Sequence, residues 1–196
     1  MAKNEILHSI LIVSASEQFA AAAKTTFPER SYMAVEIRKN AAGARRFLLE
    51  RYCDIMLINS PLPDESGIEL ALDTAEKDSV GIMIAVPADH YGDVSDRFTE
   101  QGVFAVAKPM PRERMAKTMR MLLAIQDKMH LMRQEVNAMQ EKIEELRTVD
   151  KAKFILIEKE HMTEDEAHRF IGKQAMDNGI SRKKAAERIL EEAEMY

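Results

Sequence analysis

The sequence predicts a doubly wound α/β domain with a parallel five-stranded sheet, then a long coiled-coil helix and a C-terminal three-helix bundle. Two observations predict this order. Over residues 1–112, short apolar runs alternate with segments of helical character, which is typical of a parallel sheet covered on both faces. From residue 115 to residue 146, residues that are apolar except for Thr118 recur at alternating intervals of three and four, without Gly or Pro, as in a coiled coil.

Five apolar runs are expected to form the strands. They are ILHSILIVS (6–14), YMAVEI (32–37), DIMLIN (54–59), GIMIAV (81–86) and VFAVAK (103–108). The intervening segments 16–26, 41–51, 67–77 and 91–101 are expected to form the covering helices. Strands joined in sequence by helices give a small doubly wound domain, which we assign to residues 1–112.

One expected strand ends on a polar residue. The run 55–58 is apolar without alternation and is followed by Asn59, after which Pro61, Pro63 and Gly67 prevent the strand from continuing. In an open α/β sheet, ligands and chemistry are usually found at the carboxyl ends of the strands. Asn59 therefore marks a candidate site.

The heptad pattern predicts a dimerisation helix over residues 113–147, of roughly 48 Å for its 32 patterned residues. A helix packed on a globular core drifts from a strict seven-residue register, because 3.6 does not divide seven. A long helix folded against its own sheet remains the alternative. The expected dimer interface consists of Leu122, Ile125, Met129, Met132, Val136, Met139, Ile143 and Leu146.

The positions that flank this seam are mainly basic. In a parallel dimer, Lys128 would face the partner's Arg133, and Lys142 would face the partner's Arg147. These pairs repel, so the apolar seam must carry the association, which we expect to be moderate and open to regulation.

Composition points to a cytoplasmic protein without a membrane partner. The net charge is −5, hydrophobic residues make up 46% and charged residues 31% of the chain, and no apolar run has membrane length. The single cysteine, Cys53, excludes an internal disulfide and suits a reducing compartment. The 14 methionines favour adaptable helix packing over metal or redox chemistry.

DIMLINSPLPDESG (54–67) and FAVAKPM (104–110) give residues 5–125 a resemblance to the receiver domains of response regulators in two-component systems. The resemblance implies a flavodoxin-like fold and transfer of a phosphoryl group to an aspartate at the tip of the third strand. It also implies a Mg²⁺-binding acidic pair after the first strand, a hydroxyl at the end of the fourth, and a lysine that contacts phosphate.

The sequence departs from that pattern at most of these positions. Asn59 stands at the acceptor, Ser14 and Ala15 stand at the acidic pair, and Ala85 or Val86, depending on the alignment, replaces the hydroxyl. Lys108 is kept, and we expect it to bond Asn59 or backbone carbonyls. The domain is thus predicted to be a degenerate pseudo-receiver that is not an enzyme, is not phosphorylated, and uses no cofactor or metal.

Two residues offer alternative chemistry. Glu17 could supply a carboxylate, but its position predicts a residue at the start of a helix. Ser60 could act as a nucleophile, but its position predicts a serine in a turn. The five histidines are scattered; His161 and His168, seven residues apart, read as surface or capping residues.

Residues 148–196 predict three short helices. Thr163 and Glu166 form a capping box, Asn-Gly at 178–179 ends the second helix, and Ser181 caps the last. The segments DKAKFILIEKEHMTEDEAHRFIGKQAMD (150–177) and AAERIL (185–190) resemble the ANTAR domain, the RNA-binding module of transcription antiterminators. Charge alone would not indicate RNA, because residues 147–196 hold ten Lys and Arg and eleven Asp and Glu.

The resemblance implies a dimer that binds paired stem-loops in nascent leader RNA and thereby prevents formation of a terminator. Basic residues that can share one surface, with one amide, are the expected RNA contacts: Lys151, Lys153, Arg169, Lys173, Gln174, Arg182 and Lys183. A regulatory protein docking on the pseudo-receiver is a further expected partner. The alternative function is a dimeric adaptor in a signalling pathway, without RNA binding.

Overall fold

The computed structural model describes residues 7–27, 32–77 and 80–194. The chain divides into two compact units, Met1–His130 and Leu131–Tyr196, which we describe separately. No helix among the described ranges combines the length and the apolar character needed to cross a bilayer.

The first unit contains a parallel five-stranded sheet, as the sequence predicts, and its strand order is β2-β1-β3-β4-β5. The strands are β1 (His8–Val13), β2 (Tyr32–Arg38), β3 (Ile55–Asn59), β4 (Gly81–Val86) and β5 (Phe104–Ala107). The helices between them are α1 (Glu17–Lys24), α2 (Ala41–Glu50), α3 (Ile68–Lys77) and α4 (Ala88–Glu100). Helix α4 begins earlier than expected, directly after Pro87, a residue that is tolerated at helix starts.

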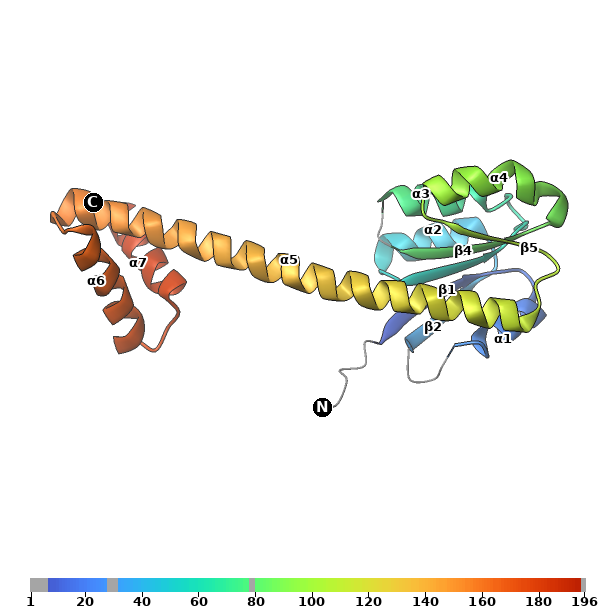
Figure 1. Cartoon of the computed structure of the whole chain (residues 1–196), viewed down its shortest axis with the longest axis horizontal. Coiled ribbons are helices and arrows are strands. Elements are labelled where there is room, and N and C mark those ends of the chain that lie inside the picture. Colours follow the sequence, from blue (N-terminus) through green and yellow to red (C-terminus); the bar gives the residue numbers. More distant parts are fainter. Residues whose placement is uncertain (1–6, 28–31, 78–79, 195–196) are drawn as a thin grey trace. The chain divides into compact units, whose positions relative to one another are not determined.

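Both faces of the sheet are covered (Figure 1). Helices α2, α3 and α4 pack on one face with Met56 and Ile58 of β3, and α1 and the start of α5 pack on the other with Ile55 and Leu57. All four side chains are fully buried, which explains why β3 shows no alternation of apolar and polar residues.

Helix α5 (Arg112–Glu160) is a single 49-residue helix. Its first turns belong to the first unit, because Met115, Met119, Leu122 and Leu123 are buried in the core against the sheet. Their spacing of four, three and one follows the 3.6-residue period of a helix on a globular core.

The predicted dimer interface is therefore wrong at its first residue. Leu122 is 1% exposed and already packed within its own chain, so it cannot line a seam with a partner. The alternative prediction, a helix folded against its own sheet, describes this part of α5. The remaining interface residues, from Ile125 to Leu146, are between 38% and 70% exposed in the single chain.

The second unit consists of the end of α5, α6 (Glu164–Asp177) and α7 (Arg182–Glu194) around a small apolar core. Thr163 and Glu166 form the predicted capping box at the start of α6. The hydroxyl of Ser181 accepts a hydrogen bond from the Lys184 amide at 3.2 Å, as expected for a cap of α7. Gly179, after the end of α6, has a φ of 61°, which favours glycine.

Candidate functional site

Asn59 and Lys108 lie at the carboxyl edge of the sheet, where they line a cavity of about 690 Å³. Asn59 is the last residue of β3, and Lys108 follows β5 directly. Ala85 on β4 is the ladder partner of Asn59, and Val86 follows it as the last residue of β4. None of the described residues that line this cavity carries a carboxylate.

Ser14 occupies the position next to Asn59. The Asn59 side-chain amide donates to Ser14 Oγ at 3.0 Å, and the Ser16 amide donates to the same oxygen at 3.1 Å. Ser14 is buried, whereas the neighbouring Ala15 is exposed and offers no polar side-chain atom. The carbonyl oxygen of the Asn59 side chain is buried and has no hydrogen-bond partner among the described residues.

Lys108 bonds a carbonyl, which is one of its two predicted partners. Its ammonium donates to the backbone carbonyl of Ser60. Partial burial lowers the pKa of Lys108, and no carboxylate is recorded against this ammonium in the described part of the chain. The cavity therefore retains a cation whose charge is not matched by an acid.

Neither alternative residue supplies the missing chemistry. Glu17 is the first residue of α1, as predicted, and its carboxylate pairs with Lys39 at 3.4 Å on the surface. Ser60 is buried, with its amide donating to the Ala85 carbonyl at 2.9 Å and its own carbonyl held by Lys108. Ser60 is thus a structural residue of the turn after β3.

The loop after β3 is tied to α2. The Asp64 carboxylate accepts hydrogen bonds from the amides of Ala41 and Ala42, both at 2.9 Å, at the start of α2. These two bonds hold the pKa of Asp64 below its usual range. Arg45 and Glu65 add a bidentate ion pair with contacts of 2.6 and 3.2 Å. These contacts hold the loop after β3 against the start of α2.

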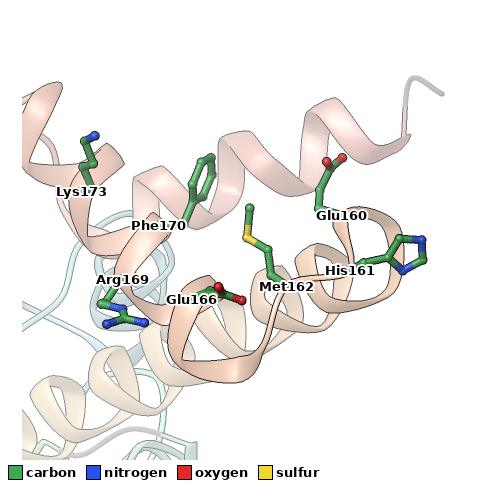
Figure 2. Close-up of a pocket in the computed structure, with 7 residues that line it drawn as sticks. All are labelled: Glu160, His161, Met162, Glu166, Arg169, Phe170 and Lys173. Carbon is green, nitrogen blue, oxygen red and sulfur yellow. The ribbon is translucent and has the colours of Figure 1, made fainter.

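In the second unit, four of the residues on α6 line a cavity of about 520 Å³ (Figure 2). Arg169 and Lys173 are one helical turn apart on α6. Phe170 lies between them in the sequence, and its side chain is half-buried. Glu160 and Glu166 also border this cavity. We call Arg169, Phe170 and Lys173 the α6 basic surface.

The Glu166 carboxylate in this cavity is already engaged. It accepts from both the amide and the hydroxyl of Thr163 at 2.8 Å, and these bonds lower the pKa of Glu166. Arg169 uses its Nε to donate to the carbonyl of Asp165 at 3.2 Å, which leaves its terminal nitrogens without a recorded bond among the described residues. Lys173 is exposed and has no recorded hydrogen bond or ion pair in that part of the chain.

Two other predicted RNA contacts already have partners within the unit. The Lys153 ammonium contacts Asp150 at 2.9 Å and Glu164 at 3.1 Å, and these carboxylates raise the pKa of Lys153. The Gln174 side chain accepts a hydrogen bond from Asn178 at 3.2 Å. Lys153 is therefore a weaker candidate for a phosphate contact than the sequence indicates.

The remaining predicted contacts lie on other helical turns. Lys151 is exposed on α5, and Arg182 and Lys183 occupy the first turn of α7. One aromatic residue stands out nearby: Phe154 on α5 is 71% exposed. Exposed aromatic rings are suited to stacking on RNA bases. The sequence does not show which aromatic side chains are exposed, so Phe154 is identified as a candidate only by the structure.

Sequence reasoning missed a cluster at the opposite edge of the sheet. It treated the histidines as scattered, but the fold brings His8 and His130 together with Asp54. A separation of 122 residues between the two histidines gives no local signal of this proximity.

Comparisons with known proteins agree with both units. Residues 137–190 match the ANTAR domain family. The chain is 26% identical over 139 residues to the transcriptional regulatory protein PdtaR of Mycobacterium tuberculosis (strains CDC 1551 / Oshkosh and H37Rv), covering 70% of this chain and 67% of that protein.

Solved receiver domains share the fold of the first unit. A CheY-like receiver domain protein from Methanospirillum hungatei JF-1 has a TM-score of 0.54 at 20% identity, covering 62% of this chain and 98% of that one. The receiver domain of an HD domain-containing protein from Pseudomonas fluorescens Pf-5 has a TM-score of 0.56 at 17% identity, covering 66% of this chain and 96% of that one. The C-terminal part of the chain thus matches the ANTAR domain family, and the first unit has the fold of receiver domains.

Proposed function

We propose that this chain is an RNA-binding antitermination regulator, which binds paired stem-loops in nascent leader RNA as a dimer and prevents formation of a terminator hairpin. The observation that carries the proposal is the α6 basic surface within the ANTAR domain. Arg169 and Lys173 present two cations on one face of α6, and no ion pair is recorded for either among the described residues, although Arg169 interacts electrostatically with Glu166. Cations so placed are suited to RNA phosphates.

Aromatic and helix-end features support RNA as the ligand. The half-buried ring of Phe170 lines the same cavity as the two cations, and Phe154 is largely exposed on α5. RNA loops are commonly read by stacking of unpaired bases on aromatic rings. Arg182 and Lys183 lie in the first turn of α7, where the amide groups and the helix dipole also favour a phosphate.

A dimer would give each RNA two binding modules. The exposed stripe from Ile125 to Leu146 keeps the heptad spacing and is long enough to pair with a second copy. Two linked modules gain avidity only when both hairpins are bound together, so the spacing set by the coiled coil would select RNAs with paired stem-loops.

Control of this regulator would not pass through an aspartyl phosphate. Asn59 offers an amide where receiver domains carry the acceptor, and Ser14 replaces one of the acids that would hold Mg²⁺. We infer that a protein docking on the first unit, or the concentration of the chain itself, sets activity instead.

The test titrates the full chain with a two-hairpin RNA from the leader of a neighbouring gene, and with a scrambled duplex. We expect the two-hairpin RNA to bind more tightly, and Lys173→Ala to weaken binding and to lower the slope of log affinity against log salt by about 1. Lys77→Ala, which removes an exposed lysine from α3 in the first unit, is the matched control and should leave both quantities unchanged.

A one-hairpin RNA tests the paired geometry. Wild-type protein should bind it less tightly than the two-hairpin RNA, and Met139→Asp, which places a charge in the seam, should abolish that difference. If the scrambled duplex binds as well and Lys173→Ala has no effect, RNA recognition is excluded and the chain is a dimeric adaptor.

A further inference from the structure

A cluster of two histidines and two aspartates lies at the amino-terminal edge of the sheet, at the other end of β3 from Asn59. His8 begins β1, Asp54 immediately precedes β3, and Asp127 and His130 lie one turn apart on α5. All four residues belong to the first unit. His8 and Asp54 are buried, and His130 and Asp127 are partly open to solvent.

The side chains of this cluster face one another at short distances. His130 Nε2 lies 2.7 Å from Asp54 Oδ1, and His8 Nδ1 lies 3.9 Å from Asp54 Oδ2. His8 Nε2 lies 3.0 Å from Asp127 Oδ1. The Ser9 amide donates to Asp54 Oδ2 at 2.7 Å and fixes the orientation of that carboxylate.

These contacts determine which nitrogen of His8 carries the proton. A carboxylate only accepts hydrogen bonds, so His8 Nε2 must donate to Asp127, and Nδ1 of the neutral ring then holds a lone pair. That lone pair is directed to the same space as the Asp54 carboxylate. His8 is 1% exposed, and its Nδ1 has no hydrogen-bond partner among the described residues. Two buried electron-pair donors facing one another are unfavourable unless a proton or a metal cation lies between them.

We propose that His8, Asp54 and His130 bind a divalent transition-metal ion such as Zn²⁺, with Asp127 as a positioning residue. His8 Nδ1, one Asp54 oxygen and His130 Nε2 lie within 4.8 Å of one another and form the ligand set. Two imidazoles and a carboxylate suit Zn²⁺, which would keep a fourth position for water. Asp127 then plays the part of the outer carboxylate that orients a metal-bound histidine.

Only small movements separate the present contacts from metal geometry. Ligands about 2.0–2.1 Å from a tetrahedral ion lie about 3.3 Å from each other. The 2.7 Å contact of His130 must lengthen, and the 3.9 Å contact of His8 must shorten. His130 must also present Nε2 as a lone pair by taking its other neutral tautomer, which its partly exposed ring permits.

An entry path is present. Asp54 and His130 both line a cavity of about 400 Å³ beside the ends of β1 and β2, so an ion can reach the cluster without unfolding of the sheet. Bound metal would tie the last turn of α5 within the first unit to the start of β1 and β3. The metal would therefore bind at a site that is separate from the RNA-binding surface and from Asn59.

The experiment uses full-length protein without an affinity tag, freed of metal by chelator and dialysed. Calorimetric titration with Zn²⁺ should show one ion per chain. His130→Ala should weaken binding by at least about tenfold, and Asp127→Ala by about 10- to 100-fold. His90→Ala, which removes an exposed histidine from α4 of the same unit, is the matched control and should bind as wild type.

The visible absorption of bound Co²⁺ reports metal coordination, and it would not change on substitution of His130 if His130 had only a structural role. Wild-type protein should give the visible absorption of four-coordinate Co²⁺, and His130→Ala should lose it while keeping the wild-type circular dichroism spectrum. Absence of Zn²⁺ binding in wild type, or equal affinity in wild type and His130→Ala, overturns the proposal.

Discussion

The side-chain amide of Asn59 donates a hydrogen bond to the hydroxyl of Ser14 at 3.0 Å, across the carboxyl ends of β3 and β1. This bond joins the two positions at which the receiver resemblance expects a phosphoacceptor and a Mg²⁺ ligand. It gives the Asn59 side-chain N–H an acceptor without any cation, whereas the side-chain carbonyl oxygen of Asn59 has no partner among the described residues. The neighbouring Lys108 is satisfied separately, by the Ser60 carbonyl.

Asn59→Asp alone is expected not to create a phosphorylation site. Mg²⁺ requires several oxygen ligands in octahedral geometry, and Ser14 and Ala15 would still supply no carboxylate. Incubation with acetyl phosphate and Mg²⁺, followed by intact-mass measurement, should show no added phosphoryl group on wild type or variant. A phosphoryl group on wild type that disappears in Asn59→Ala would contradict this prediction.

Ser14→Ala is expected to destabilise the first unit by about 1–3 kcal/mol, because it leaves the Asn59 amide without an acceptor in a part-buried site. The loss should be measured by native-state hydrogen exchange of the β1 and β3 amides, since a chain of two units need not unfold in one step. Ser95→Ala, a change at a partly exposed position on α4, should shift the same amides by less than about 0.5 kcal/mol. Equal effects of the two substitutions would show that the Asn59–Ser14 bond contributes nothing.

Asp64 is expected to contribute to the pH dependence of the stability of the first unit in acid. Its folded-state pKa lies below its unfolded value because the Ala41 and Ala42 amides bond the ionised form. The stabilisation is therefore complete above the unfolded pKa, about 3.9, and is lost as pH falls through the lower folded pKa.

Asp64→Asn should consequently lower stability at neutral pH and flatten the decline of stability in acid, as measured by thermal melts over a pH series. Asp93→Asn, on the exposed surface of α4, serves as the control and should keep the wild-type acid profile. An unchanged profile in Asp64→Asn would mean that the two amide bonds do not favour the carboxylate.

Met139→Asp is expected to shift the dimer towards monomer, because it places a charge in the middle of the exposed heptad stripe. Sedimentation at roughly tens of micromolar should show wild-type dimer and a variant whose dissociation constant rises by about tenfold or more. Leu131→Asp is matched in exposure on the same helix but lies outside the stripe, and should leave association unchanged. A wild-type monomer at these concentrations would contradict the coiled-coil prediction.

Local patterns were sufficient for most of the fold. The five strands, the capping box of Thr163 and Glu166 and the cap at Ser181 were all predictable, because each depends on residues close together in the chain. The partner of Lys108 was narrowed to two choices by the same reasoning, and the structure selects the Ser60 carbonyl.

Helix α5 shows where a sequence pattern fails to distinguish between partners. Leu122 fits the heptad and also fits the 3.6-residue spacing of the face packed on the sheet. Both patterns place an apolar residue at that position, so its burial within the same chain depends on where the sheet ends. The partners of Lys153 on α5 and α6 likewise come from the folded arrangement.

The sequence by itself determined the order of strands and helices, the loss of the receiver acids and the ANTAR resemblance, because these are properties of residue type and spacing. Only the tertiary structure decided that Ser14 bonds Asn59 and that Leu122 belongs to the core. It also brought His8, Asp54 and His130 together. Parallel strands and a returning helix place residues far apart in the chain at one edge of a sheet, and linear spacing carries no record of that proximity.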